Sequence, residues 1–501
     1  MIRAIMFLGT GSDVGKSIVA AAFCRIFKRR GYKVAPFKAQ NMSNNSFVTV
    51  EGGEIGRAQV VQAEAAGLLP SVHMNPILLK PSSEMGSQLI VQGRVLDQVD
   101  AKDYHRLKPM LKHAVMDSYN RLAGEYDMIV MEGAGSCCEM NLKENDLVNF
   151  PMAREAGAAC ILVGDIDRGG IFPQIVGSFH LMSPEERDMT IGFMVNKFRG
   201  DPGLFMSGMD YLEEKTGWPG LGLIPFYTRI TIDPEDSVIL QQDRRRIKAV
   251  GPETLNIAVL KLPAISNFTD MDGLERERDL VLNYLVNPRE LTDLYDWVIL
   301  PGTKNVMEDA LWLSRSGWKT RIRRFARQGG VILGLCGGFQ LMGKVIRDPG
   351  GVESHRKEVK GLGLLPVETV LEREKVVRRV TGACLINRRR VRGYEIHMGR
   401  TYPAAPAEEG SGPLLRIHEP GKRRIWEDGW SLDQGRIAGT YVHGVLDSPG
   451  LRSHILNGLR RAKGLKERPP GRGRRGRFHQ YDRLADHFER HSKVEEIVAL
   501  I

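Results

Sequence analysis

Short apolar runs, each ended by glycine or polar residues, alternate with helix-like segments along most of the chain. Continuous apolar runs of roughly four to eight residues are typical of buried parallel strands, and their alternation with helices indicates βαβ units. The sequence therefore predicts an α/β protein. The expected strands lie at residues 2–8, 33–37, 128–131, 159–163 and 191–195, and then at residues 256–260, 298–300, 331–335 and 437–442.

A polar break divides this pattern into two halves. Residues 241–248 are rich in Arg and Gln, and a new α/β pattern begins just after them. A chain of 501 residues is long enough for several domains. We therefore expect a first domain over residues 1–245 and a second over residues 252–450.

A basic tail accounts for most of the net charge of +11. Residues 460–477 hold nine Arg and Lys residues against one acid, a charge of +8 that leaves the rest of the chain near +3. With its Pro and Gly residues, segment 460–478 is typical of a disordered, solvated linker rather than of a nucleic-acid site. Residues 480–501 are expected to form a helix that docks through Leu484 and Phe488. We expect no nucleic-acid partner.

The composition is that of an ordinary globular protein, with 42% hydrophobic and 26% charged residues. No apolar run reaches the roughly eighteen residues that a membrane helix needs, and the N-terminal apolar stretch is too short for a signal peptide. Six scattered cysteines without C-x-x-C pairs suit a reducing compartment. These features predict a cytoplasmic protein without a membrane partner, and they leave the oligomeric state open.

A glycine-rich loop, residues 9–17, follows the first expected strand and precedes a helix-like segment. This order, with Lys16 and Ser17 at the end of the loop, indicates a P-loop for a nucleotide phosphate. Backbone N–H groups of the loop, with Gly11 and Gly15 in it, would surround the phosphates. Lys16 would neutralise the β and γ oxygens of ATP, and the Ser17 hydroxyl would ligate Mg²⁺.

Polar residues after the second expected strand suit an oxygen-rich substrate. Lys38 follows that strand beside the P-loop, where its ammonium group can reach a transferring phosphoryl group. The next residues offer amide and hydroxyl groups, although an Asn/Ser-rich surface loop would have the same composition. The candidate substrate contacts in this run are Gln40, Asn41, Ser43 and Asn44.

Further candidate ligands follow other strands. Glu132 follows the strand at residues 128–131, and a carboxylate beside the P-loop is the expected partner of Mg²⁺. Glu64 is a second candidate for the metal. Asp165 and Arg168 lie at another strand end and suit contact with the substrate or the metal.

One cysteine occupies a special position. Cys336 lies between the strand at residues 331–335 and a helix-like segment, with Gly337 behind it. A helix N-terminus favours the thiolate, and the glycine lets backbone N–H groups face a developing oxyanion. His443, at the end of the strand at residues 437–442, would be the proton acceptor and donor that a Cys nucleophile needs. The alternative is a buried structural cysteine.

The Gly-Leu-Cys-Gly-Gly turn around Cys336 and the Tyr-Val-His-Gly stretch around His443 resemble the class I glutamine amidotransferase domain. The resemblance implies that Cys336 forms a thioester with the glutamine side chain and releases ammonia. Gly302, in a Pro-Gly turn after a strand, would join Gly337 in the oxyanion hole. His443 is followed by Gly-Val where that family usually has Pro-Glu, so the third carboxylate of the triad is expected to be missing.

The first half resembles dethiobiotin synthetase, whose longer phosphate loop G-T-x-x-x-V-G-K-[ST] matches residues 9–17. This implies a doubly wound P-loop domain in which Asn196 reads the adenine edge. Lys-Ala-Gln-Asn-Met-Ser at residues 38–43 resembles a signature of the cobyric acid synthase family, as does the run at residues 393–399. That second run contains His397, for which we expect a structural or interface role rather than that of the base.

This resemblance implies an enzyme that amidates the b, d, e and g carboxylates of adenosylcobyrinic acid a,c-diamide to give adenosylcobyric acid. Each amide would use one ATP and one glutamine and would form through an acyl phosphate. The resemblance further implies ATP and Mg²⁺ in the first domain, L-glutamine as the ammonia donor and a corrinoid as the substrate.

Several alternatives share parts of this pattern. Cobyrinic acid a,c-diamide synthase, or another carboxylate amidoligase, would have the same two domains, but the run at residues 38–43 argues against the former. CTP synthase keeps a complete Cys-His-Glu triad. The alternative from another class is a P-loop ATPase whose amidotransferase-like domain is inactive and serves only for binding. Glutaminase activity, and its loss on Cys336→Ala, would exclude that alternative.

Overall fold

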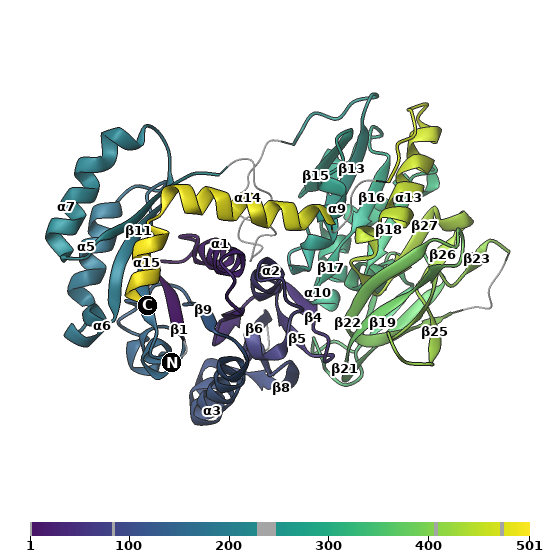
Figure 1. Cartoon of the computed structure of the whole chain (residues 1–501). Helices are drawn as coiled ribbons and strands as arrows, with labels where there is room; N and C mark the ends of the chain where they lie inside the picture. Colours follow the sequence, from purple (N-terminus) through teal and green to yellow (C-terminus); the bar gives the residue numbers. More distant parts are fainter. Residues whose placement is uncertain (1–2, 83–85, 228–246, 405–408, 471–474) are drawn as a thin grey trace.

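Two lobes meet along a broad contact, and the chain ends in the lobe in which it begins (Figure 1). This computed structural model describes residues 3–82, 86–227, 247–404, 409–470 and 475–501. The α/β class predicted from the sequence is confirmed, whereas the domain boundary expected at residue 245 lies outside the described residues.

A six-stranded parallel sheet forms the centre of the first lobe, in the order β12-β11-β10-β1-β9-β2. Apolar side chains alternate along its central strand. Ile5 and Phe7 pack with α1 and α14, whereas Met6 and Leu8 pack on the opposite face with α3, α5 and α7. The strands are β1 (Arg3–Gly9), β2 (Val34–Phe37), β9 (Met128–Glu132), β10 (Ala159–Asp165), β11 (Thr190–Phe198) and β12 (Gly220–Pro225).

Helices cover both faces of this sheet, as in a doubly wound fold. They are α1 (Lys16–Arg29), α2 (Arg57–Ala65), α3 (Ala101–Glu125), α4 (Phe150–Ala156), α5 (Ile171–Leu181), α6 (Pro184–Asp188), α7 (Met206–Thr216), α14 (Arg475–His491) and α15 (Val494–Leu500).

Small β elements extend the first lobe towards the second (Figure 1). A four-stranded sheet has the order β3-β6-β7-β8, and β4 and β5 form a separate antiparallel pair. Their bounds are β3 (Gln40–Met42), β4 (Ser46–Val48), β5 (Glu54–Gly56), β6 (Ile77–Ser82), β7 (Gly86–Val91) and β8 (Arg94–Val99). The polar run after β2 therefore leads from the parallel sheet to the junction of the lobes.

The second lobe contains a seven-stranded sheet in the order β15-β13-β16-β18-β27-β26-β23, whose first five strands are parallel. The carboxyl ends of parallel strands meet at one edge, so the segments that follow them can share a site. The strands are β13 (Leu255–Leu260), β15 (Leu280–Leu285), β16 (Trp297–Leu300), β18 (Val331–Leu335), β23 (Ser411–Gly412), β26 (Trp430–Leu432) and β27 (Ile437–Thr440).

A second, largely antiparallel sheet of this lobe contains the long pair β21 (Val367–Cys384) and β22 (Arg390–Pro403). Its other strands are β19 (Val345–Arg347), β20 (Glu358–Lys360), β24 (Leu415–His418), β25 (Ile425–Asp428) and β28 (Val442–His443). The main helices of the lobe are α9 (Asp272–Glu275), α10 (Val306–Arg315), α11 (Trp318–Arg327), α12 (Gly337–Met342) and α13 (Pro449–Ala462), and short elements near the site are β14 (Ile265–Ser266), η4 (Phe268–Met271) and β17 (Gly302–Thr303).

The C-terminal segment differs from the expected linker and single helix. Arg460, predicted to lie in a disordered linker, is 1% exposed, because Asp279, just before β15, pairs with it at 2.8 Å. Residues 471–474 lie outside the described residues. Leu484 and Phe488 are fully buried, and two helices, α14 and α15, lie where a single helix was expected.

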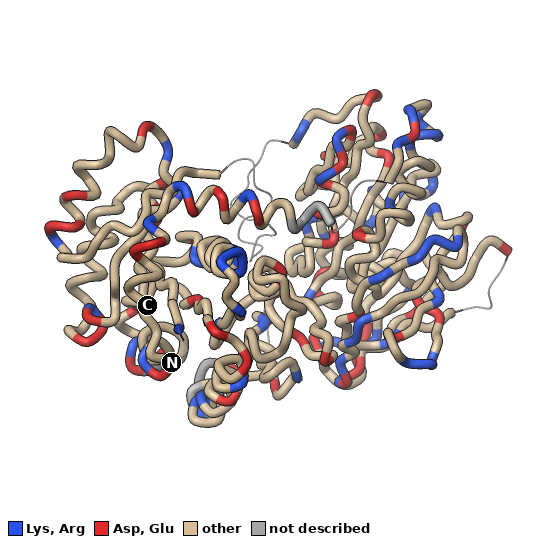
Figure 2. The backbone as a smooth tube through the Cα atoms, in the orientation of Figure 1, with Lys and Arg blue, Asp and Glu red and all other residues tan. Residues whose placement is uncertain are grey.

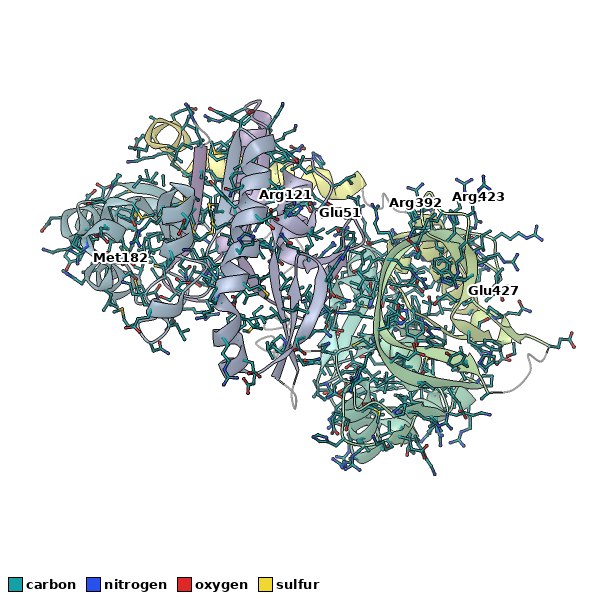
Figure 3. All side chains as sticks on the ribbon, turned by 90° about the horizontal axis from the view of Figure 1, so that it is seen from below. Glu51, Arg121, Met182, Arg392, Arg423 and Glu427 are labelled. Carbon is teal, nitrogen blue, oxygen red and sulfur yellow. The ribbon has the colours of Figure 1, made fainter. Side chains whose placement is uncertain are left out.

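Basic and acidic residues are interspersed along both lobes (Figure 2). Seen from below, Arg392, Arg423 and Glu427 lie on the second lobe, Met182 lies far away on the first, and Glu51 lies near the junction (Figure 3). Among the described helices, none is long and apolar enough to cross a membrane.

Candidate active sites

The P-loop connects β1 to α1 and is held by groups from two other strands. Lys16 donates through Nζ to the Gly11 carbonyl at 2.9 Å and to the Gly135 carbonyl at 2.8 Å. Gly15 has φ 101°, and a Cβ there would lie 2.2 Å from the Asn196 amide nitrogen. Only glycine fits this left-handed, crowded position, which allows the backbone to close around a phosphate.

Glu132 lies at the centre of a buried polar cluster at the end of β9. Its Oε1 accepts from the Ser17 hydroxyl at 2.7 Å and from Lys38 Nζ at 2.8 Å. Its Oε2 accepts from Gln62 at 2.6 Å and from Gln59 at 3.4 Å. Glu132 is 1% exposed, and these hydrogen bonds hold its carboxylate beside Ser17, the second residue of α1.

A cavity of about 790 Å³ opens beside this cluster. Most of the residues predicted from the sequence to contact the nucleotide, the metal or the substrate line this cavity. Other side chains that were not predicted also line it. The nominated residues are Gly15, Lys16, Ser17, Lys38, Gln40, Asn41, Glu132 and Arg168, and the added ones include Tyr104, Lys108, Lys143, Lys197 and Tyr227.

Other nominated residues lie outside this cavity. Glu64 accepts from the Tyr481 hydroxyl at 2.7 Å, and Asp165 bonds to Lys197 at 2.8 Å. Asn196 is fully buried, and its Nδ2 donates to the Val14 carbonyl at 2.9 Å. The structure therefore places Asn196 beneath the P-loop and Glu64 against the C-terminal helix. Gly11 is in the P-loop without lining the cavity, and Ser43 and Asn44 lie towards the junction of the lobes.

Cys336 lies on a strained turn between β18 and α12. Its φ is 51°, a left-handed value that is uncommon for a residue with a Cβ. Behind it, a Cβ on Gly338 would lie 2.0 Å from the Leu300 carbonyl, and one on Gly337 would lie 2.6 Å from Thr303. The glycines thus bring α12 against the end of β16, which positions the thiol at the carboxyl edge of the sheet.

A carboxylate supports the histidine of this site. His443 Nδ1 lies 2.7 Å from Asp270 Oδ2, and the Gly444 N–H donates to Asp270 Oδ1 at 2.7 Å. The expectation that the third carboxylate is missing is therefore wrong: it comes from η4, after β13, and not from the residues behind His443. Burial alone would lower the pKa of His443, but the charges of Asp270 and Cys336 and the hydrogen bond to Asp270 raise that pKa to about 10.

Two residues of this site could have been found from topology. Strands β13, β16, β18 and β27 are parallel. Cys336 follows β18 and His443 comes just after β27. Asn267 and Asp270 follow β13 in the same way. Segments at one sheet edge converge, so polar side chains after β13 were candidates for the same site. Asn267 Nδ2 lies 3.2 Å from His443 Nε2.

His397 is near this site but is differently placed. Its ring stacks on Tyr441 at 3.8 Å between centroids, and its Nδ1 lies 3.0 Å from the Gly399 carbonyl. Burial lowers the pKa of His397 to about 3, so the ring is neutral. These contacts are those of a packed, structural histidine.

A buried ion cluster joins the lobes between the two sites. Glu54 of β5 accepts from Lys80 at 2.7 Å and from Lys375 of β21 at 2.6 Å. Burial alone would raise the pKa of Glu54, but Lys375 and Lys80 lower it well below its ordinary value. Glu54 Oε1 also accepts from the Ser46 hydroxyl at 2.7 Å, so the cluster contacts the segment that leads from the cavity to the second lobe.

Comparison with known proteins covers both lobes. The model of the CobQ/CobB/MinD/ParA nucleotide binding domain matches residues 5–238, and that of the CobB/CobQ-like glutamine amidotransferase domain matches residues 256–450. The cobyric acid synthase of Syntrophobacter fumaroxidans is 50% identical over 511 residues, covering 100% of this chain and 98% of that protein. That of Chlorobaculum tepidum is 46% identical over 497 residues, covering 99% and 97%. Among solved structures, PurLQS from Thermotoga maritima is similar, with TM-score 0.31 and 18% identity, over 41% of this chain and 99% of that chain.

Proposed function

The chain belongs to the cobyric acid synthase family, and we propose that it converts adenosylcobyrinic acid a,c-diamide into adenosylcobyric acid. Members of this family are glutamine-dependent carbon–nitrogen ligases of cobalamin biosynthesis. The proposal adds that the b, d, e and g carboxylates of the corrinoid are amidated, each with one ATP and one glutamine.

The first half-reaction takes place in the cavity beside the P-loop. A carboxylate oxygen of the corrinoid attacks the γ-phosphorus of ATP, ADP leaves, and an acyl phosphate forms. Lys16 and Lys38 offset the negative charge that accumulates during this transfer. Gln40, Asn41 and Arg168 line the same cavity and are our candidates for holding the corrinoid carboxylates.

Ser17 and Glu132 are our candidates for holding Mg²⁺. Their oxygens lie 2.7 Å apart at the base of the cavity, and a hydroxyl and a carboxylate are the hard donors that Mg²⁺ prefers. Since Mg²⁺ commonly takes its other ligands from phosphates and water, two protein oxygens fit this site. When bound, the ion would neutralise charge on the β- and γ-phosphates.

The second half-reaction takes place at Cys336. His443 takes the thiol proton, the sulfur attacks the glutamine amide carbon, and the backbone near Gly302 and Gly337 stabilises the oxyanion. His443 then protonates the leaving ammonia, and water hydrolyses the thioester to glutamate. Asp270 accepts from Nδ1–H of His443 and so keeps the ring in the required tautomer. Ammonia then displaces phosphate from the acyl phosphate.

The single observation that carries this proposal is the 2.7 Å contact of His443 with Asp270 beside Cys336. It disfavours an amidotransferase-like domain that only binds, because a buried carboxylate on Nδ1 is the partner that an active base requires. All six cysteines are free, which suits the reducing cytoplasm, where we place the reaction.

Mass spectrometry of cobyrinic acid a,c-diamide, incubated with the protein, Mg-ATP and glutamine, tests the proposal. Each amidation should lower the mass by about one unit, and the series should end at four amides. Cys336→Ala should amidate with ammonia but not with glutamine. An untouched diamide with continued ATP hydrolysis would mean that the substrate is another carboxylic acid.

A further inference from the structure

Asn267 connects His443, the proposed general base of the glutaminase site, to the first lobe. It is 3% exposed and has φ 49°, a left-handed value that Asn adopts more readily than most residues. Its Oδ1 accepts from the Ser46 backbone N–H at 3.0 Å, and its Nδ2 lies 3.2 Å from His443 Nε2. One amide therefore bonds to both lobes.

Ser46 fixes the orientation of this amide. A backbone N–H can only donate, so Asn267 must direct Oδ1 to Ser46 and Nδ2 to His443. An amide nitrogen can also only donate, so Nε2 of His443 must be unprotonated in this arrangement. Nδ1–H of His443 bonds to Asp270, so the ring is held as a neutral imidazole. Its basic nitrogen, Nε2, already accepts a hydrogen bond from Asn267.

The other groups around His443 favour the opposite state. Asp270 on η4 and Cys336 before α12 both stabilise a protonated ring. From β22, Tyr394 stacks on His443 at 5.4 Å, and His397 is kept neutral by burial. A protonated histidine beside a thiolate is the reactive form of a Cys-His pair. The Asn267 amide thus opposes the charge state that the rest of the site favours.

Ser46 belongs to the segment that begins in the ATP cavity. Gln40 and Asn41 line that cavity, and the chain passes directly from them to Ser46. The Ser46 carbonyl accepts from the Tyr394 hydroxyl at 3.3 Å, and its own hydroxyl donates to Glu54. A substrate that displaces this segment therefore changes the position of the Ser46 N–H.

We propose that Asn267 is a positioning residue that couples the ATP cavity to glutamine hydrolysis. With Ser46 in place, its amide nitrogen occupies Nε2 of His443. When bound substrate draws Ser46 away, the amide turns about its Cβ–Cγ bond, and its oxygen accepts Nε2–H of the protonated ring. Glutamine is then hydrolysed fastest when an acceptor for ammonia is present. This inference rests on the proposed roles of Cys336 and His443.

The first test needs no corrinoid. Alkylation of Cys336 by iodoacetamide is followed against pH by mass spectrometry of its peptide. Asn267→Asp tolerates the left-handed backbone and places an oxygen against both Ser46 and His443, so the alkylation midpoint should fall by about one pH unit. Asn387→Asp, which adds the same charge in a distant turn, should leave the midpoint unchanged. An unchanged midpoint in Asn267→Asp overturns the proposal.

The second test measures glutamine hydrolysis with and without Mg-ATP and the a,c-diamide. In the wild type the added ligands should accelerate hydrolysis by about 5–150-fold. In Asn267→Asp and Asn267→Ala the ratio should approach one, while amidation with ammonia continues, which shows that both variants are folded. Wild-type stimulation in Asn267→Ala contradicts the coupling. If the wild type fails to amidate the diamide even with ammonia, the substrate is wrong, and the alkylation midpoints still decide the role of Asn267.

Discussion

At the scale of single residues, the proposed glutaminase site combines side chains from three separate loops at one sheet edge. Asp270 makes two hydrogen bonds of 2.7 Å to the segment of His443, one to the ring and one to the backbone behind it. These contacts fix both the ring tautomer and the position of the ring. They act on the histidine and make no contact with the ATP cavity.

Replacing Asp270 by Asn should therefore separate the two half-reactions. An amide on Nδ1 favours the wrong tautomer of His443, and glutamine-dependent amidation should fall by roughly 10²–10⁴-fold. Amidation with ammonia should be retained, because the ATP cavity is unchanged. Steady-state rates with each nitrogen donor measure this split. Asp433→Asn, at an exposed ion pair with Arg436, is the matched control, and equal losses with both donors would mean that Asp270 is only structural.

The sequence analysis nominated residues that lie in contiguous motifs and missed residues that the topology brings to the same sheet edge. Lys16, Ser17 and Cys336 each lie within a short run whose spacing carries the chemistry. Asp270 lies far from His443 in sequence, and only the parallel order of β13, β16, β18 and β27 brings the two together. The bond of Asn196 to the Val14 carbonyl was also not predictable, because the spacing of a strand-end amide does not show that it supports the phosphate loop.

At the scale of elements, α14 is part of the first lobe although it comes from the end of the chain (Figure 1). Phe488 is fully buried, with its ring 6.5 Å from that of Phe23 on α1. Asp482 and Asp486 pair with Arg25 and Arg29 of α1 at 2.7 and 2.6 Å. Because α1 begins with Lys16, the packing of α14 supports the helix whose first turn lines the cavity beside the P-loop.

Phe488→Ala should destabilise the first lobe by about 3–5 kcal/mol, since it leaves a cavity against α1. Thermal unfolding should show an earlier transition that ATP shifts back upwards, because ligand binding stabilises the folded lobe. Arg483→Ala, at an exposed position of the same helix, should unfold like the wild type. Coincident melting curves for Phe488→Ala and the wild type would show that α14 adds little to the lobe.

The i, i+4 stripe of Leu484 and Phe488 was enough to predict a docking helix, but not its partner. The basic segment before it was harder to interpret, because composition does not show which charges are neutralised. Arg460 forms an ion pair with Asp279 of the second lobe, and Lys463 forms one with Asp296, each with an N–O distance of 2.8 Å. Such pairing depends on sheet positions that a local pattern does not encode.

At the scale of the whole molecule, the buried Glu54 cluster ties the lobes together. Glu54→Gln would leave Lys80 and Lys375 buried without their carboxylate, at a cost of about 3–5 kcal/mol. Glutamine-dependent amidation should fall more than amidation with ammonia, and amide hydrogen exchange in β4 and β5 should accelerate. Glu374→Gln, on the same strand as Lys375 but 84% exposed at its side chain, is the control. Unchanged exchange in β4 and β5 would show that the cluster does not hold the junction.

The packing of α14 on the first lobe also has a consequence for the synthesis of the chain on the ribosome. While the ribosome is still translating the second lobe, the face of α1 that Phe488 covers has no partner from the chain's end. At roughly 5–20 residues per second, the first lobe waits on the order of 10–50 s for its last helix. During that interval the nascent chain exposes apolar surface around Phe23 and Phe27, and exposed apolar surface of this kind favours aggregation. A truncation before residue 475 would make that exposed state permanent.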